Sequence, residues 1–109
     1  GTHMKITADY DAGKLTIHLS GELDHHSARE GMAGIERLLD EYMPRDAVLD
    51  MSGLTFMDSA GIALLLKTER LMRVSGGRAS IANPAKQPLR VLDASGIERK
   101  IHVTGGSIR

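Results

Sequence analysis

The stretch Leu54–Leu66, LTFMDSAGIALLL, predicts a strand, a tight turn and a helix in direct succession. An apolar run ends at Asp58, two small residues and Gly61 follow, and a leucine-rich segment then begins. Asp58 and Ser59 are both favourable helix N-caps, and the start of a helix needs only one. With Asp58 as the cap, Ser59 becomes the first helical residue with an exposed hydroxyl. Ser59 is therefore available for a role other than capping.

Strand and helix patterns alternate on both sides of this stretch. Residues 5–23 predict a hairpin around the turn Asp11–Gly13. Apolar and polar residues alternate along 14–20, which is typical of a half-buried strand. His18 then points away from the core, and no function is predicted for it. Helical spacing of apolar residues predicts helices at 26–43, 59–75 and 85–95, and the remaining apolar segments predict strands at 46–51, 78–83 and 100–104.

The resulting order, ββαβαβαβ, predicts one α/β domain. Strands that alternate with helices pair in parallel through right-handed crossovers, so the sheet is expected to be mixed, mostly parallel, and opened by the N-terminal hairpin. The domain is expected to span residues 5–104. Residues 1–4, GTHM, are interpreted as a scar of expression, and residues 105–109 as a tail.

Composition argues against several classes of function. The 14 basic and 14 acidic residues cancel, and the chain has only two tyrosines and one phenylalanine, so it offers neither a basic field nor a stacking platform for nucleic acid. There is no cysteine for thiolate chemistry. No apolar run approaches the roughly 20 residues of a membrane span, and no signal peptide is visible. The expectation is a cytoplasmic protein that is monomeric when free.

The surroundings of Ser59 suit a phosphoacceptor. Ala60 and Gly61 are expected to leave the surface beside it almost bare, and the free amides and dipole of a helix start favour an anion. Ala63, Lys67 and Arg70 continue the solvent side of the helix that begins at Ser59, whereas a second set of residues forms the predicted core stripe. That stripe comprises Ile62, Leu65, Leu66 and Met72.

A second polar segment, GELDHH at 21–26, follows the second strand. Asp24 or Ser27 is the expected N-cap of the helix after it. Parallel neighbouring strands end at the same edge of a sheet, so Asp24 and Asp58 are expected to lie near each other and to flank Ser59. The two carboxylates then form an acidic patch suited to a basic partner. Asp24, His25 and His26 are consecutive and cannot all face one ion, so no metal site is predicted.

A serine hydrolase is the alternative from the enzyme class. A nucleophile elbow has the pattern G-x-S-x-G, and the first glycine is missing here. His25 or His26 could act as the base and Asp24 or Asp58 as its orienting group, but a chain of this size has little room for a substrate pocket beside its core. The chain is therefore predicted not to be an enzyme. It also lacks a G-x-x-x-x-G-K-[ST] loop, and no cofactor is predicted.

Three motifs resemble the STAS domain of anti-sigma factor antagonists, and most closely the sporulation type. They are GELDHH at 21–26, FMDSAGI at 56–62 and LDASGI at 92–97, and the similarity runs in register from about residue 6 to residue 103. The resemblance implies a partner-switching regulator of transcription. Its unphosphorylated form binds an anti-sigma factor that is also a serine kinase, and this binding releases the sigma factor. The kinase then phosphorylates the serine of the motif, here Ser59, and a PP2C-type phosphatase reverses the step.

Carried over residue by residue, the resemblance implies a docking surface around Ser59. Its members are Asp24, Asp58, Ser59, Ala60, Gly61, Ala63 and Lys67. The family often has a second serine where this chain has Ala60, which leaves one acceptor. Relatives also commonly continue into a final helix where this chain reads TGGSIR, so the last strand is expected to be less covered. A STAS module of another pathway remains the alternative, in stress signalling, a stressosome-like assembly or lipid transport.

Overall fold

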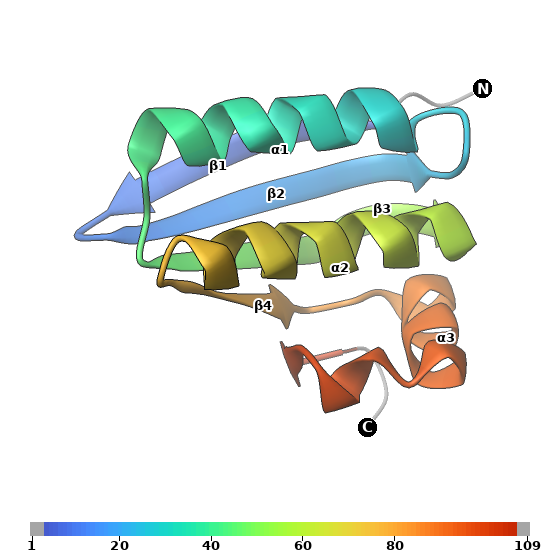
Figure 1. The fold of residues 1–109 in the computed structure, drawn as a ribbon. Coiled ribbons are helices and arrows are strands. Elements are labelled where there is room, and N and C mark those ends of the chain that lie inside the picture. Colours follow the sequence, from blue (N-terminus) through green and yellow to red (C-terminus); the bar gives the residue numbers. More distant parts are fainter. Residues whose placement is uncertain (1–3, 107–109) are drawn as a thin grey trace.

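The computed structural model describes residues 4–106 of the 109-residue chain. Residues 1–3 of the predicted scar and residues 107–109 of the predicted tail lie outside the described residues. The elements in chain order are β1 Lys5–Asp11, β2 Lys14–Leu23, α1 Ala28–Tyr42, β3 Asp46–Met57, α2 Ser59–Val74, β4 Arg78–Ala82, α3 Lys86–Ser95, a 3₁₀ turn Ile97–Arg99 and β5 His102–Thr104 (Figure 1).

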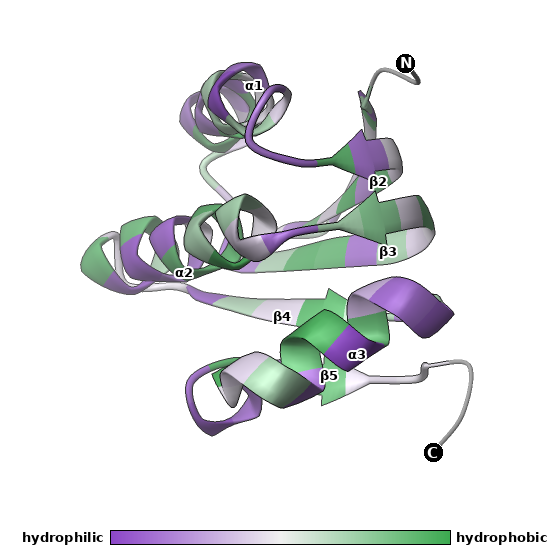
Figure 2. Ribbon diagram, turned by 90° about the vertical axis from the view of Figure 1, so that its right-hand side faces the viewer, coloured by the Kyte–Doolittle hydropathy of each residue, from purple (hydrophilic) through white to green (hydrophobic). Residues whose placement is uncertain are grey.

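The sheet has the order β1-β2-β3-β4-β5. The β1–β2 hairpin is antiparallel, and the other neighbouring strands pair in parallel. The predicted mixed sheet with its N-terminal hairpin is confirmed. Figure 2 shows α1 and α2 on the same side of the sheet.

Alternation along β2 determines which face of the sheet meets the helices. Leu15, Ile17 and Leu19 are at most 1% exposed and belong to the core beneath α1 and α2. Burying one such side chain contributes about 1.5–3 kcal/mol. His18 points to the opposite face, as predicted, where its ring nitrogens lie 2.7 Å from an Asp50 carboxylate oxygen and 2.9 Å from one of Asp9. These two hydrogen bonds raise the pKa of His18, Asp50 contributing the most.

The largest difference from the predicted elements is the length of β3. The strand was predicted at 46–51 and extends to Met57. It can do so because β2 is also long, and the two strands remain paired as far as Leu23 and Met57 across two register shifts. The 3₁₀ turn Ile97–Arg99 was not predicted, and β5 begins at His102 instead of residue 100. Because β3 reaches Met57, the turn that carries Ser59 starts from a rigid strand end.

Candidate functional site

The start of α2 has the predicted cap. Asp58 is extended and accepts a hydrogen bond of 2.8 Å from the backbone N–H of Ala60, and the Gly61 N–H donates to the Asp58 carbonyl at 3.0 Å. Ser59 is the first residue of α2 and is exposed. The two amides next to Ser59 are thus already bonded, which leaves fewer of them for an added anion than the sequence suggested.

Asp58 also connects this turn to the loop between β2 and α1. Its backbone N–H donates to the Leu23 carbonyl at 3.2 Å, and its carboxylate accepts from the His25 N–H at 3.2 Å. The His25 Nδ1 lies 3.6 Å from the same carboxylate oxygen. The two loops therefore meet at one edge of the sheet, which places the segment containing Asp24 beside the Ser59 turn, as the parallel pairing predicts.

Asp24 shapes the beginning of α1. Its carboxylate accepts hydrogen bonds from the backbone N–H groups of His26 at 2.9 Å and Ser27 at 3.0 Å. Ser27 occupies the N-cap position, but its hydroxyl donates to the Glu22 carbonyl at 2.8 Å and does not cap the helix. The bonds from Ser27 and then His26 outweigh desolvation and lower the pKa of Asp24. Asp24 is therefore ionised at neutral pH, as an acidic patch requires.

Gly61 lies in a different environment from the one its place in the motif suggested. It is buried, and a Cβ added to it would collide with Cγ and Sδ of Met57 and lie 3.2 Å from Cδ2 of Leu23. The expectation that Gly61 bares the surface beside Ser59 is wrong, because the space above its Cα is filled by core side chains. Gly61 lets α2 approach β2 and β3 closely, and a direct contact between Gly61 and a partner stays a prediction.

The solvent side of α2 is confirmed for Ala63, Lys67 and Arg70, which are exposed. The Lys67 Nζ lies 3.9 Å from an Oε1 of Glu36 on α1. Lys67 therefore extends the exposed surface from α2 toward the neighbouring helix.

The core side of α2 differs in part from the predicted stripe. The buried residues are Gly61, Leu64, Leu65, Thr68 and Met72. Ile62 and Leu66 were predicted to be buried and are only partly so. Both pack against the core cluster and leave part of their apolar area accessible on α2.

Gln87 on α3 is a residue of the site that the sequence did not reveal. Its side-chain Oε1 accepts from the Met57 N–H at 2.7 Å, and its Nε2 donates to the Met57 carbonyl at 2.9 Å. The amide thus pairs with the end of β3 as a further strand would, directly before Asp58. A lone glutamine in an amphipathic helix gives no signal of a contact thirty positions away. Gln87 is best described as a positioning residue for the turn.

We expect Gln87→Ala to lower the free energy of unfolding by about 1–2 kcal/mol, because it leaves two backbone groups of Met57 without their partner. Urea denaturation measures the loss, and amide hydrogen exchange should be faster at Met57. Arg90→Ala, an exposed change on the same helix, serves as the control and should alter stability by less than about 0.5 kcal/mol. Unchanged exchange at Met57 would show that Gln87 does not hold the end of β3.

The geometry does not support a hydrolase. Among residues 4–106 no histidine is hydrogen-bonded to the Ser59 hydroxyl, and the imidazole of His25 lies against the carboxylate of Asp58. No group of three or more metal-ligating side chains is present in the described part of the chain. No described helix is long and apolar enough to cross a membrane. What the site presents is an exposed residue, Ser59, at a helix start that the Asp58 carboxylate caps, with the Asp24 loop joined to Asp58 through His25.

Comparison with known proteins adds four findings. The family model of the STAS domain matches residues 4–106. An anti-sigma F factor antagonist of Paenibacillus polymyxa is 30% identical over 95 residues, which cover 87% of this chain and 81% of that protein. The solved structure of the anti-sigma factor antagonist SpoIIAA in its unphosphorylated form has a TM-score of 0.76 at 26% identity, covering 91% of this chain and 87% of the other. SpoIIAA of Bacillus in the phosphorylated form has a TM-score of 0.68, also at 26% identity, with 91% and 90% covered.

Proposed function

Because the chain belongs to the STAS domain family, we propose that it is an anti-sigma factor antagonist of the cytoplasm that switches partners through phosphorylation of Ser59. In the unphosphorylated form it binds an anti-sigma factor with serine kinase activity, and the sigma factor is released. The observation that carries the proposal is the exposed Ser59 directly after Asp58, whose carboxylate caps α2. A related protein, SpoIIAA, has been solved in both an unphosphorylated and a phosphorylated form, which supports a switch of this kind.

The charges around Ser59 explain how one phosphate would end binding. A phosphoserine carries about −1.5 to −2 charges at neutral pH. The amides of Ala60 and Gly61 already donate to Asp58, and Asp58 and Asp24 add negative charge nearby. The new charge would therefore be poorly compensated by this chain. Burying it in an interface without a cationic partner would be costly, so the anti-sigma factor would dissociate.

The same features favour a regulator that is acted upon over an enzyme. Within residues 4–106 no base is hydrogen-bonded to the Ser59 hydroxyl, whereas a kinase can supply its own base and reach an exposed hydroxyl. A PP2C-type phosphatase would reset the switch. A STAS module of another pathway would share the fold, but a lipid-transport accessory has no need of an exposed serine directly after a capping aspartate.

The test is phosphorylation and binding with purified candidate anti-sigma factors of the serine kinase type, using the wild type and Ser59→Ala. We expect the wild type to bind and, with ATP, to gain one phosphate that intact mass spectrometry and peptide mapping place at Ser59. Ser59→Ala should bind with similar affinity and gain none. A phosphate on Ser59→Ala, or failure of the wild type to bind any candidate, contradicts the proposal.

A further inference from the structure

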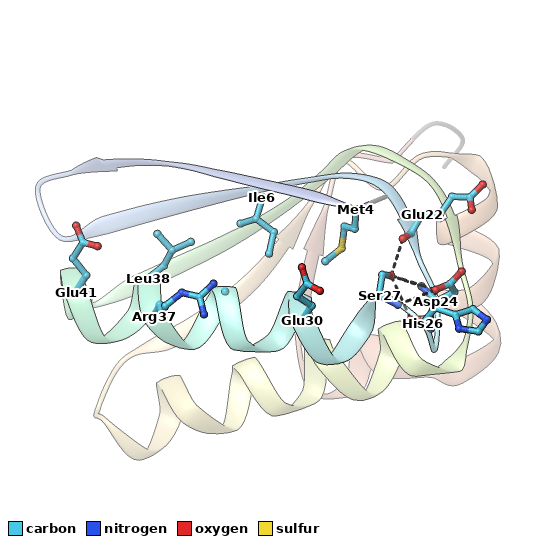
Figure 3. Close-up of a pocket in the computed structure, with 12 residues that line it drawn as sticks. Met4, Ile6, Glu22, Asp24, His26, Ser27, Glu30, Arg37, Leu38 and Glu41 are labelled. Atoms are coloured by element: carbon cyan, nitrogen blue, oxygen red, sulfur yellow. Dashed lines mark hydrogen bonds between the residues drawn. The ribbon is translucent and has the colours of Figure 1, made fainter. Parts of the chain in front are cut away.

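A groove runs between α1 and the strands β1 and β2 (Figure 3). Its volume is about 830 Å³. The floor is apolar and is formed by Met4 and Ile6 at the start of the chain's first strand and by Leu38 on α1, all three partly buried. We call this feature, with the residues lining it from Met4 to Glu41, the α1–β1 groove.

The groove is open along the side of the sheet. β1 is the edge strand, so no further strand covers this flank among the described residues. On α1, Gly31 and Gly34 face β1, and a Cβ on Gly34 would lie 3.3 Å from Cδ1 of Ile6. Two glycines in one helix are unfavourable for helix formation by up to about 1 kcal/mol each against alanine. Because neither position carries a side chain, Met4 and Ile6 pack close against α1 and form the apolar floor.

The charge of the groove is predominantly negative. Glu22, Glu30 and Glu41 stand along it, and Asp24 closes one end (Figure 3). Within residues 4–106 none of the three glutamates forms an ion pair, and Arg37 is the one lysine or arginine among the lining residues. An apolar floor below unpaired carboxylates is complementary to an amphipathic and basic chain segment, and it disfavours anions such as nucleotides.

We propose that the α1–β1 groove binds a basic amphipathic segment of the anti-sigma factor, in addition to the contact at Ser59. Apolar side chains of that segment lie on Met4, Ile6 and Leu38, and its lysines or arginines meet Glu30 and Glu41. The inference rests on the proposed function, because it takes the same partner. Asp24 lines the end of the groove and belongs to the proposed docking surface, so one partner can contact both.

The first test reverses the charge of Glu30 and Glu41, two glutamates that line the groove. We expect Glu30→Lys/Glu41→Lys to weaken binding of the anti-sigma factor about 10- to 100-fold at low salt, mainly through slower association, since rim charges act on encounter rates. The loss should shrink as ionic strength rises and the Debye length falls from about 10 Å at 0.1 M. Asp40→Lys is the matched control, because Asp40 is exposed on α1 outside the groove. It should change affinity less than 3-fold.

The second test fills the groove without changing its charge. Gly34→Leu places a side chain against Ile6 and improves the helix propensity of α1, so the variant should fold, as circular dichroism checks. We expect it to lower affinity at least 10-fold at every salt concentration.

The two proposals can fail separately. The groove proposal is refuted if Glu30→Lys/Glu41→Lys and Gly34→Leu both bind the anti-sigma factor with wild-type affinity. If Ser59→Asp loses binding in the same assay, the proposed function still stands. A wild-type chain that binds no anti-sigma factor would refute both. The groove proposal is supported if Glu30→Lys/Glu41→Lys and Gly34→Leu both lose affinity for the anti-sigma factor while Asp40→Lys keeps it.

Discussion

Ser59→Asp should weaken binding to the anti-sigma factor about 100-fold, which corresponds to about 2.7 kcal/mol at 25 °C. The substitution puts a fixed negative charge at the exposed start of α2, next to Asp58, whose carboxylate already occupies the Ala60 amide. Within residues 4–106 no lysine or arginine forms an ion pair with the neighbouring Asp58, so docking must desolvate the added carboxylate without a cationic partner from this turn. Isothermal titration calorimetry or surface plasmon resonance measures the affinity.

Ser75→Asp is the matched control for this experiment. It makes the same chemical change at the exposed C-cap of the same helix, about 24 Å from Ser59 for a 16-residue helix. We expect an affinity within 3-fold of the wild type, after a check that the variant is folded. If Ser59→Asp and Ser75→Asp bind equally well, charge at Ser59 does not control the interaction and the switch is refuted.

Gly61→Ala should destabilise the fold by about 2 kcal/mol. The added methyl group would overlap Met57, which is fully buried between α2 and the sheet, and it would press on Leu23. Overpacking of this kind costs about 1–3 kcal/mol, and the better helix propensity of alanine offsets at most about 1 kcal/mol of it. At about 4–8 °C per kcal/mol, the midpoint of thermal unfolding should fall by about 8–16 °C.

Gly34→Ala separates packing from helix propensity. Its methyl group would approach two flexible side-chain ends, Cδ1 of Ile6 at 3.3 Å and Nη2 of Arg37 at 3.8 Å, so the gain in propensity should dominate and stability should rise slightly. Differential scanning calorimetry of the two alanine variants gives opposite signs if the interpretation of Gly61 is correct. A stabilised Gly61→Ala would mean that Met57 can move aside at little cost.

The fold was predictable because its signals are local and periodic. Alternation at Leu15, Ile17 and Leu19 shows which face of β2 is buried, and Asp58 marks the start of α2. Contacts between segments that are distant in the sequence could not be predicted. The pairing that extends β3 to Met57 depends on a second strand of matching length, and no pattern within residues 52–57 reveals it.

The site was predictable to the extent that topology determines it. Parallel strands end at one edge, and this brings the Asp24 loop to the Ser59 turn. The role of Gly61 was misread because a glycine in a first helical turn suits an exposed surface and a crowded core equally well from sequence. Gln87 was missed because its contact with Met57 depends on where α3 docks.

The docking of α3 also bears on the order in which parts of the chain fold. The β1–β2 hairpin is local, and hairpins form in about 1–10 μs. The pairings of β2 with β3 and of β3 with β4 each enclose a whole crossover helix, and such non-local pairings form more slowly. Gln87 can hold Met57 only after α3 has docked, so we expect the turn that presents Ser59 to be completed late. A kinase that requires this turn would modify finished molecules and pass over chains still folding on the ribosome.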